Sequence, residues 1–447
     1  METDAARSAA PLTWIAAALG CAFCALTAQV GADGRWLAAV GAGIAQLRRL
    51  PDAVPYAAAP SAGWHDAPVL GQLVFHALES VGGDRGLLLA QTIAVGIALA
   101  AVALDLRRTG AGDVAGAAVL LAVVIAAPAA LLVARAELFS LALFPVLVLL
   151  VRTGRRLWLA VPLLVVWANL HGGVLVGFGV LAGYLVLHEL RPRPFRTAAL
   201  LAGGAAALLA TPQLGRTALY YSGVLHGETA AQHYGLWAPL SLHRPLDVLF
   251  LALAVPLVAA ALWSRPAAWE IVLLLALAAL SLRAERNGIW LLLFAAAPAG
   301  RALTRRPGRA ALSRLTAAVA AVAPALLIGL GATHRHDEDG AGAPLLARTA
   351  KLAAGSPVLA DPLDAEKLAL RGTRIWIGNP IDAFSRAEQR LYLRWLRGDP
   401  GGDAILRPAI RVVLVTRGSR PQELLAREAA FRELARDGRT VLYLRRV

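Results

Sequence analysis

The chain has little of what marks a soluble enzyme or a secreted module. Only 16% of its 447 residues are charged, and only Cys21 and Cys24 are cysteines. Two cysteines supply no disulfide framework, and no metal-ligand cluster, nucleotide-binding loop or catalytic triad of diagnostic spacing occurs in the sequence. Because the cysteines lie three positions apart in an apolar segment, we interpret them as packing residues rather than a redox pair, by about five to one.

Lysine is also scarce. The net charge is +15, yet Lys351 and Lys367 are the only lysines. The other basic residues are arginines, and nearly all fall in short clusters between apolar segments. This pattern is typical of signals that orient membrane helices rather than of a phosphate-binding face for nucleic acid. We therefore expect no nucleic-acid partner.

Apolar residues are abundant, at 58% of the chain. Repeated apolar stretches near the length that crosses a bilayer predict an α-helical polytopic membrane protein with about 11 spans. The first stretch, Leu12 to Val30, is interpreted as a retained helix because Glu2 and Asp4 oppose Arg7 before it. The predicted helices cover residues 12–31, 86–105, 114–134, 138–151, 157–170, 172–190, 197–212, 245–264, 267–283, 288–300 and 315–332.

The arginine clusters also predict the orientation of these helices. They fall on alternate turns of one side, which the positive-inside rule assigns to the cytoplasm. The N-terminus then lies in the cytoplasm, and the C-terminal region lies outside it. The clusters are at residues 107–108, 152–156, 191–196, 265 and 301–314.

Composition divides the chain into a transmembrane domain (1–332) with an outer loop (32–85), a connector (333–355) and a small soluble α/β domain (356–447). In the outer loop Trp36, Val40, Ile44 and Leu47 recur at helical spacing, which predicts a helix lying on the membrane surface. A second apolar helix is expected over residues 69–81.

In the C-terminal domain, strands are expected at 357–360, 374–377, 410–415 and 440–444. Helices are expected between them at 363–370, 385–397 and 421–436. Strands that alternate with helices indicate a mostly parallel sheet. The acidic and histidine-rich tract at residues 333–340 is interpreted as a solvated connector rather than a metal site, by about four to one.

Polar residues at the predicted outer face are the candidate site. Ionisable groups at a membrane boundary are costly to desolvate, so their convergence suggests function. For any single residue, simple exposure at a loop end is favoured by about two to one. Asp33, with Asp66 as partner, is the candidate general base or ligand of a divalent cation. The substrate-binding candidates, including arginines for a lipid phosphate, are Arg135, Glu137, Asn169, His171, Arg216, Arg286 and Asn287.

The order of several short motifs resembles a known group of proteins. They are an Asp just after the first helix, G-W-x-D at 63–66, A-R-A-E-L-F-S at 134–140, W-A-N-L-H-G-G at 167–173, T-P-Q-L-G at 211–215, L-W-A-P at 236–239, R-N at 286–287 and R-I-W-I-G-N-P-I-D at 374–382. Together they resemble bacterial polytopic membrane proteins similar to the GT-C superfamily of glycosyltransferases. The resemblance spans nearly the whole chain and rests on the order of the motifs.

The resemblance implies a transferase in the bacterial inner membrane that takes a sugar from a polyprenyl-phosphate donor on the outer face. Asp33 matches the position of the carboxylate used by that group, and the acceptor would be a glycan or a lipid. The sequence departs from the pattern after Asp33, where Gly34, Arg35, Trp36 and Leu37 replace an aromatic pair and a histidine. A divergent or inactive member therefore stays open.

Two other functions are considered. A non-catalytic carrier or assembly partner in cell-envelope polysaccharide biogenesis would have the same membrane architecture. A secondary transporter fits less well, because the predicted hydrophobic cores lack the buried acids and charged pairs that ion coupling requires.

Overall fold

The computed structural model describes residues 11–305 and 341–446. They form two compact units, each assembled from separate segments. We call residues 11–29, 88–210 and 236–305 the helical unit, and residues 30–87, 211–235 and 341–446 the sheet unit. The division predicted from composition follows the order of the chain, whereas each compact unit joins segments far apart in it.

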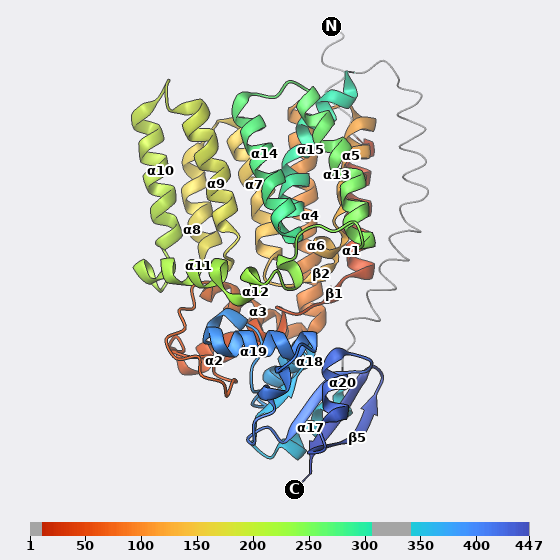
Figure 1. Cartoon of the computed structure of the whole chain (residues 1–447). Coiled ribbons are helices and arrows are strands. Elements are labelled where there is room, and N and C mark those ends of the chain that lie inside the picture. The colour runs from red at the N-terminus through yellow and green to blue at the C-terminus, as the bar shows by residue number, and fades with distance from the viewer. Residues whose placement is uncertain (1–10, 306–340, 447) are drawn as a thin grey trace. The chain divides into compact units, whose positions relative to one another are not determined.

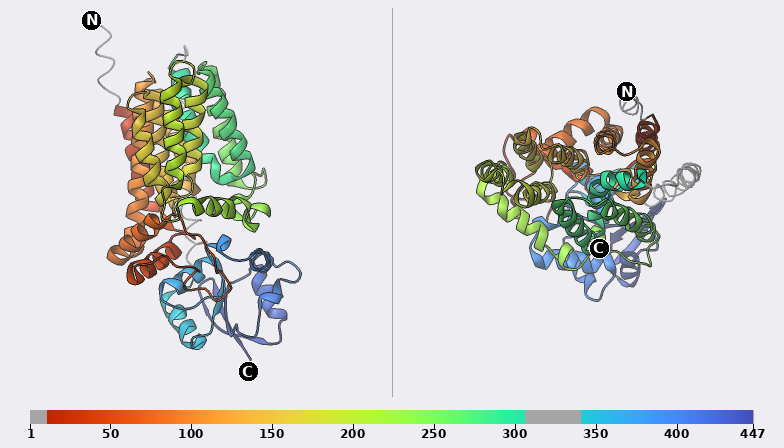
Figure 2. Two further views of the ribbon diagram at one scale, coloured as in Figure 1. Left: turned by 90° about the vertical axis from the view of Figure 1, so that its left-hand side faces the viewer. Right: turned by 90° about the horizontal axis from the view of Figure 1, so that it is seen from above.

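The helical unit is a set of long apolar helices that run side by side (Figures 1 and 2). Their small residues allow close approach, as expected where lipid offers no hydrophobic gain for helix association. At Gly116, an added Cβ would lie 2.5 Å from Oγ1 of Thr13. The helices are α1 (Pro11–Thr27), α4 (Asp84–Arg108), α5 (Asp113–Ala126), α6 (Pro128–Leu132), α7 (Leu138–Thr153), α8 (Ala160–Leu170), α9 (Val174–Tyr184), α10 (Pro194–Leu209), α13 (Pro245–Trp263), α14 (Ala268–Arg283) and α15 (Gly288–Thr304).

Shorter elements connect these helices. Single helical turns precede α8 and α15, and α9 continues into a π turn. The elements are β1 (Gln29–Val30), β2 (Val133–Ala134), η2 (Leu157–Leu159), η3 (Leu185–Glu189), η5 (Gly235–Trp237) and η6 (Glu285–Asn287).

Two helices of the described residues, α4 and α13, are long and apolar enough to cross a membrane alone. A third span results if the broken pair 194–209 and 214–231 is counted as one. Six further apolar helices have 10–17 residues. The mostly helical fold agrees with the prediction, while the number of spans stays a prediction.

Most predicted helices have a counterpart within two or three residues of the expected bounds. The predicted helix 114–134 is instead divided into α5 and α6. Pro128 lacks the N–H that would continue the hydrogen-bond ladder, so the chain breaks at Ala127 and restarts with Pro128 in the first turn of α6. The predicted helix 315–332 and the tract 333–340 lie outside the described residues.

In the sheet unit, two helices from the outer loop pack together. They are α2 (Arg35–Leu47) and α3 (Val69–Gly82), and α18 (Pro362–Leu370) packs on α2. Gly41 allows the close approach, since a Cβ there would lie 2.1 Å from the carbonyl oxygen of Gln72. The helical periodicity of Trp36, Val40 and Ile44 is confirmed, and all three side chains are buried within this unit.

The remaining elements of this unit surround a four-stranded mixed sheet in the order β3-β4-β6-β5. Only β3 and β4 are parallel, so the prediction of a mostly parallel sheet is wrong. The strands are β3 (Val358–Ala360), β4 (Val412–Thr416), β5 (Phe431–Asp437) and β6 (Thr440–Arg445). The helices and single turns of this unit are η4 (Leu214–Arg216), α11 (Thr217–His226), α12 (Glu228–Ala231), α17 (Ala343–Ala353), η7 (Ile381–Ala383), α19 (Arg386–Arg397), η8 (Gly402–Ile405) and α20 (Arg420–Arg427).

The predicted helix 421–436 is wrong in its second half, because α20 ends at Arg427 and β5 begins at Phe431. β5 is an edge strand whose charged side chains are partly exposed, so it lacks the alternation of a buried strand. Gly438, with φ of 55°, closes the hairpin to β6. Pairing with β6 therefore decides the conformation of this segment.

The predicted strand 374–377 is reduced to isolated bridges. Ile375 bridges Ala57 of the outer loop and Val358 of β3. The main-chain N–H of Ala59 also donates to the carbonyl of Trp376, at 2.8 Å. The segment therefore joins the outer loop to the C-terminal sheet within one unit.

Candidate functional site

Four of the predicted site residues come together in the helical unit. Arg135 and Glu137, between β2 and α7, form a buried ion pair with 2.5 Å between Nη2 and Oε2. His171 lies in the turn between α8 and α9, and Arg286 lies in η6. The charges of Arg135 and Arg286 both act on Glu137 and His171. We call these four residues the arginine cluster.

Within this cluster the two arginines differ. Glu137 neutralises Arg135, whereas Arg286 forms no ion pair with a described residue. The Arg286 guanidinium stacks over the Trp237 ring, 5.0 Å from its centroid. This stacking holds the side chain in place without neutralising its charge. The cluster therefore keeps one net positive charge from Arg135, Glu137 and Arg286.

The imidazole of His171 is also held in place. Its Nδ1 lies 2.6 Å from Oγ of Ser140 and 3.2 Å from the main-chain nitrogen of Gly173. Ser140 Oγ in turn accepts a hydrogen bond from the indole Nε1 of Trp167, at 2.7 Å. Both Ser140 and Trp167 are fully buried.

The other predicted substrate-binding residues have different surroundings. Asn169 donates from Nδ2 to the carbonyls of Val165 and Ala210, and Asn287 donates to the carbonyl of Leu280. These amides thus tie helix ends together. Arg216 belongs to the sheet unit and is exposed.

The sheet unit holds Asp33, which has a φ of 77° in the left-handed region. The chain around it is anchored on the buried carboxylate of Glu366 in α18. The main-chain N–H groups of Asp33 and Arg35 donate to Glu366 at 2.8 and 3.1 Å. Asn379 donates to the same carboxylate at 2.8 Å. Trp36 Nε1 donates to Oδ1 of Asp33 at 3.0 Å, so the candidate base is oriented from both backbone and side chain.

Glu366 was not predicted as a site residue. Burial raises the pKa of its carboxyl to about 7, and the nearby charge of Asp33 adds to the rise. Its interactions with the chain around Asp33 join residues more than 330 positions apart. No local pattern in the sequence could reveal such a contact, although Asn379 stands in the N-P-I-D motif noted above.

Asp66 is buried, with 1% of its surface exposed. Its Oδ1 accepts a hydrogen bond from Gln72 at 2.7 Å, and its Oδ2 has no partner among the described residues. Burial raises the pKa of Asp66 to about 7, with a further contribution from the charge of Asp382. A carboxyl in this setting holds a proton at neutral pH more readily than an ordinary aspartate. Its catalytic role stays a prediction.

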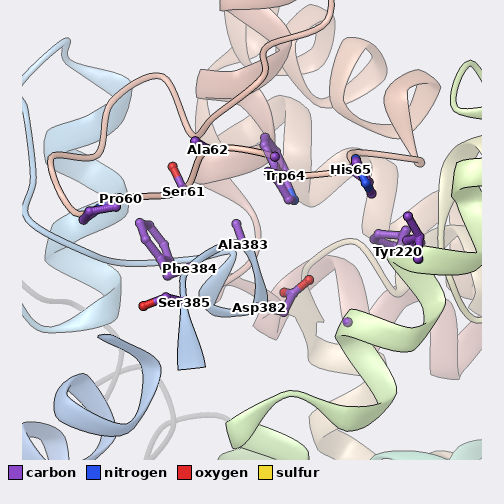
Figure 3. A pocket seen from close by; sticks show the side chains of 13 residues that line it. Pro60, Ser61, Ala62, Trp64, His65, Tyr220, Asp382, Ala383, Phe384 and Ser385 are labelled. Carbon is purple, nitrogen blue, oxygen red and sulfur yellow. The ribbon is translucent and has the colours of Figure 1, made fainter. Parts of the chain in front are cut away.

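A pocket of about 340 Å³ lies beside these acids, wholly within the sheet unit. The G-W-H-D loop, α11 and the segment 382–385 line it (Figure 3). Figure 3 shows His65 and Tyr220 on one side, Phe384 on the other, and Trp64 reaching toward Asp382 and Ala383. Among the residues that the structure describes, no arginine or lysine lines this pocket. Burial raises the pKa of Asp382 to about 6, and the charge of Asp33 adds to the rise.

Metal ligation was an open possibility for Asp33. Within residues 11–305 and 341–446, no group of three or more His, Cys, Asp or Glu side chains is arranged to hold a metal ion. The requirement for a divalent cation stays an expectation of the resemblance.

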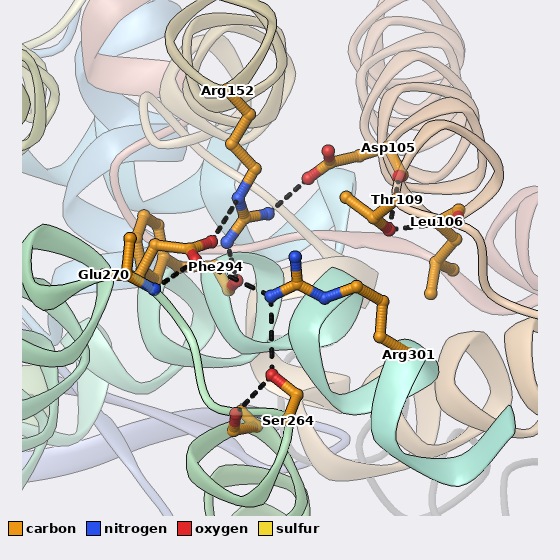
Figure 4. A network of polar contacts seen from close by, with 10 residues as sticks. Asp105, Leu106, Thr109, Arg152, Ser264, Glu270, Phe294 and Arg301 are labelled. Atoms are coloured by element: carbon orange, nitrogen blue, oxygen red, sulfur yellow. Dashed lines mark hydrogen bonds and ion pairs between the residues drawn. The ribbon is translucent and has the colours of Figure 1, made fainter. Parts of the chain in front are cut away.

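The helical unit also contains a network of buried charges that the sequence interpretation had not expected (Figure 4). Arg152 of α7 forms ion pairs with Asp105 of α4 and, at 3.2 Å, with Glu270 of α14. Arg301 approaches the same Glu270 at 3.6 Å. Arg152, Glu270 and Arg301 lie in the terminal turns of their helices, so the network stands at helix ends, and the absence of charged pairs from the hydrophobic cores stays a prediction. These acids are matched by arginines, so the network serves first to join α4, α7, α14 and α15.

Comparison with known proteins supports the fold. No family model and no curated protein matches the sequence. A crystal structure of ArnT from Cupriavidus metallidurans bound to undecaprenyl phosphate matches with a TM-score of 0.61 and 15% identity, over 97% of both chains. The apo structure of ArnT matches with a TM-score of 0.57 and 16% identity, over 96% of both chains. The chain therefore has the same fold as ArnT.

Proposed function

We propose that the protein is a membrane glycosyltransferase that moves a sugar from a polyprenyl-phosphate donor to a glycan or lipid acceptor. The observation that carries this proposal is the match of nearly the whole chain to ArnT, which was crystallised with undecaprenyl phosphate. We place the protein in the bacterial inner membrane, with its N-terminus in the cytoplasm and its C-terminal domain outside. The arginine clusters of the sequence support this orientation.

The arginine cluster supplies a site for the donor phosphate. Arg286 carries a charge that no described acid neutralises, and its stacking on Trp237 leaves the planar guanidinium preorganised. Such a group makes paired hydrogen bonds to phosphate oxygens. Arg135 and His171 add a second cation and a ring nitrogen to the same cluster. The donor brings its sugar on the lipid, so no nucleotide-binding loop is required.

Asp33 is the proposed general base. Its carboxylate would take the proton of an acceptor hydroxyl as that oxygen bonds to the anomeric carbon. The bond between the anomeric carbon and the phosphate oxygen breaks in the same step, and polyprenyl phosphate leaves with the electron pair. Such a displacement inverts the anomeric centre. The neighbouring pocket would receive an uncharged part of the acceptor, since aromatic side chains and Asp382 line it without a cation.

The first experiment tests the lipid ligand. Native mass spectra of the purified protein in mild detergent should show a co-bound polyprenyl phosphate. Arg286→Ala and Arg135→Ala should lose this adduct, whereas Arg283→Ala should keep it, because Arg283 is an exposed arginine of the same turn. Adducts that match bulk phospholipid in all four proteins would contradict the proposal. That outcome would favour a carrier or assembly partner.

A further inference from the structure

The arrangement around His171 specifies which of its two ring nitrogens carries the proton. Gly173 has only its main-chain N–H to offer Nδ1, so Nδ1 must accept that bond. Trp167 has only an indole N–H, so Ser140 Oγ must accept from it. Ser140 Oγ lies 2.6 Å from Nδ1, and because Nδ1 already accepts from Gly173, the hydroxyl of Ser140 is the donor in this contact.

Nδ1 therefore accepts from two donors and has no room for a proton of its own. A neutral imidazole has one N–H, which must then be on Nε2. Protonation of the ring would break the bond from Gly173 and reverse the bond with Ser140. We infer that Ser140, Trp167 and Gly173 hold His171 as a neutral imidazole whose Nε2–H is a fixed hydrogen-bond donor to a phosphate oxygen of the lipid ligand. This inference rests on the proposed function and assigns His171 a binding role instead of an acid–base role.

The packing of the W-A-N-L-H-G-G motif agrees with this assignment. An added Cβ at Gly173 would lie 2.5 Å from Ser140 Oγ and 2.9 Å from His171 Nδ1. At Gly177, one turn further, a Cβ would lie 2.4 Å from the Trp167 ring. Both glycines are thus required to let the donors reach their acceptors. Within the motif, Trp167 and Gly173 therefore serve to fix the tautomer of His171.

Charges around His171 make a neutral ring favourable. Arg135 and Arg286 repel a second positive charge, while Glu137 attracts one but is already paired with Arg135. A neutral His171 ring does not repel Arg135 and Arg286, as an imidazolium would. The ring and the two guanidiniums can therefore all contact one phosphate. The affinity for a lipid phosphate should then change little between pH 5.5 and pH 7.5 on account of His171.

Two measurements test the inference, and the first does not depend on the proposed function. Nitrogen-15 spectra of protein labelled in histidine should give His171 the shifts of a neutral Nε2–H ring throughout pH 5.5–7.5. The resonance is assigned by its loss in His171→Gln. A His171 ring that is protonated or that carries its proton on Nδ1 would overturn the inference, whether or not the protein binds lipid.

Binding of dodecaprenyl or undecaprenyl phosphate in nanodiscs gives the second measurement. Ser140→Ala removes the hydroxyl donor and lets the ring turn, so we expect affinity to fall about 5- to 10-fold at pH 7.5. Arg135 and Arg286 still repel an imidazolium in this variant, so its pH profile should stay flat. Ser140→Thr keeps a hydroxyl and should restore the affinity. In a His171→Gln background, Ser140→Ala should have little effect, since Ser140 acts through the histidine.

A Ser140→Ala variant with wild-type affinity would overturn the positioning role of Ser140. If Ser140→Ala unfolds, Trp167→Phe takes its place, because it removes the indole N–H at the far end of the relay, together with part of the ring, and keeps Ser140. Loss of all lipid binding in wild type, with the histidine spectra as expected, would instead overturn the proposed function and leave the tautomer assignment standing.

Discussion

The helical unit and the sheet unit both bury carboxylates, and they neutralise them in different ways. In the helical unit, Glu137, Asp105 and Glu270 each face an arginine. In the sheet unit Glu388 is likewise paired with an arginine, Arg407. Four other acids of that unit, the buried Asp66 and Glu366 and the half-buried Asp33 and Asp382, form no ion pair with a described residue. Hydrogen bonds from main-chain N–H groups and amides take the place of arginine at Glu366 and Asp66.

This difference separates two roles for buried charge. An acid matched by arginine stays ionised and holds helices together, and its removal leaves the partner uncompensated. Asp66, Glu366 and Asp382, which have no cation beside them, have raised pKa values and can take or release a proton near neutral pH. Proton transfer is therefore expected of the sheet unit, and anion binding of the arginine cluster in the helical unit.

The largest effect is expected for Asp33→Asn. Loss of the general base should lower turnover about 100- to 10,000-fold, measured as release of polyprenyl phosphate from a polyprenyl-phosphate sugar. Lipid binding should persist, because the arginine cluster is unchanged. Asp52→Asn, an exposed aspartate of the same outer segment, is the matched control. Equal turnover in Asp33→Asn and wild type would show that Asp33 is not the general base.

Arg152→Met should be the most destabilising change in the helical unit. The Arg152 side chain is 6% exposed, and its loss leaves Asp105 and part of Glu270 without a cation. Breaking one partner of a buried ion pair costs about 3–5 kcal/mol of unfolding free energy. Titration with a denaturing detergent in mixed micelles measures it, with the exposed Arg155→Met as control. A loss below about 1 kcal/mol would mean that pairing does not hold this unit together.

In the sheet unit, Asp66→Asn should raise the unfolding free energy rather than lower it. The folded-state pKa of Asp66 is raised from 3.8 to about 7, so the native state holds the proton more tightly than the unfolded chain. The resulting stability is fully present below about pH 4 and is lost as pH rises through about 7. Asparagine does not titrate and escapes this loss.

Asp66→Asn should therefore match wild type near pH 4 and exceed it at pH 8, by an amount on the order of 4 kcal/mol. Thermal unfolding of the full-length protein across this range is the measurement, and Asp52→Asn should follow the wild-type curve. A variant less stable than wild type at pH 8 would show that the ionised carboxylate is needed for folding.

The smallest effect is expected in the pocket. Because the pKa of Asp382 is raised to about 6, its charge develops between pH 5 and pH 7. The KM for the acceptor should change only about 2- to 5-fold over that interval, because one carboxylate is a single contact among several. In Asp382→Asn this dependence should vanish while kcat is kept. A large fall in kcat would instead place Asp382 among the groups that move the proton.

Much of the fold could be predicted from the sequence, because its signals are local. Apolar length predicted α4 and α13, and helical spacing in the outer loop predicted α2. The split at Pro128 and the strand β5 were missed for different reasons. A single proline interrupts an otherwise uniform apolar stretch, and an edge strand such as β5 takes its conformation from its neighbour β6.

The sequence by itself determined the residue types of the candidate site and the apolar helices that carry it, because both follow from composition and from the spacing of residues. It named seven substrate-binding candidates, and the structure brings four of them together: Arg135, Glu137, His171 and Arg286. Only the tertiary structure decided how the groups are used. Pairing with Glu137, the relay from Trp167 through Ser140 and the anchoring of Asp33 on Glu366 are contacts between distant segments. Charge state and tautomer follow from such contacts, because burial and hydrogen-bond partners fix where each proton resides.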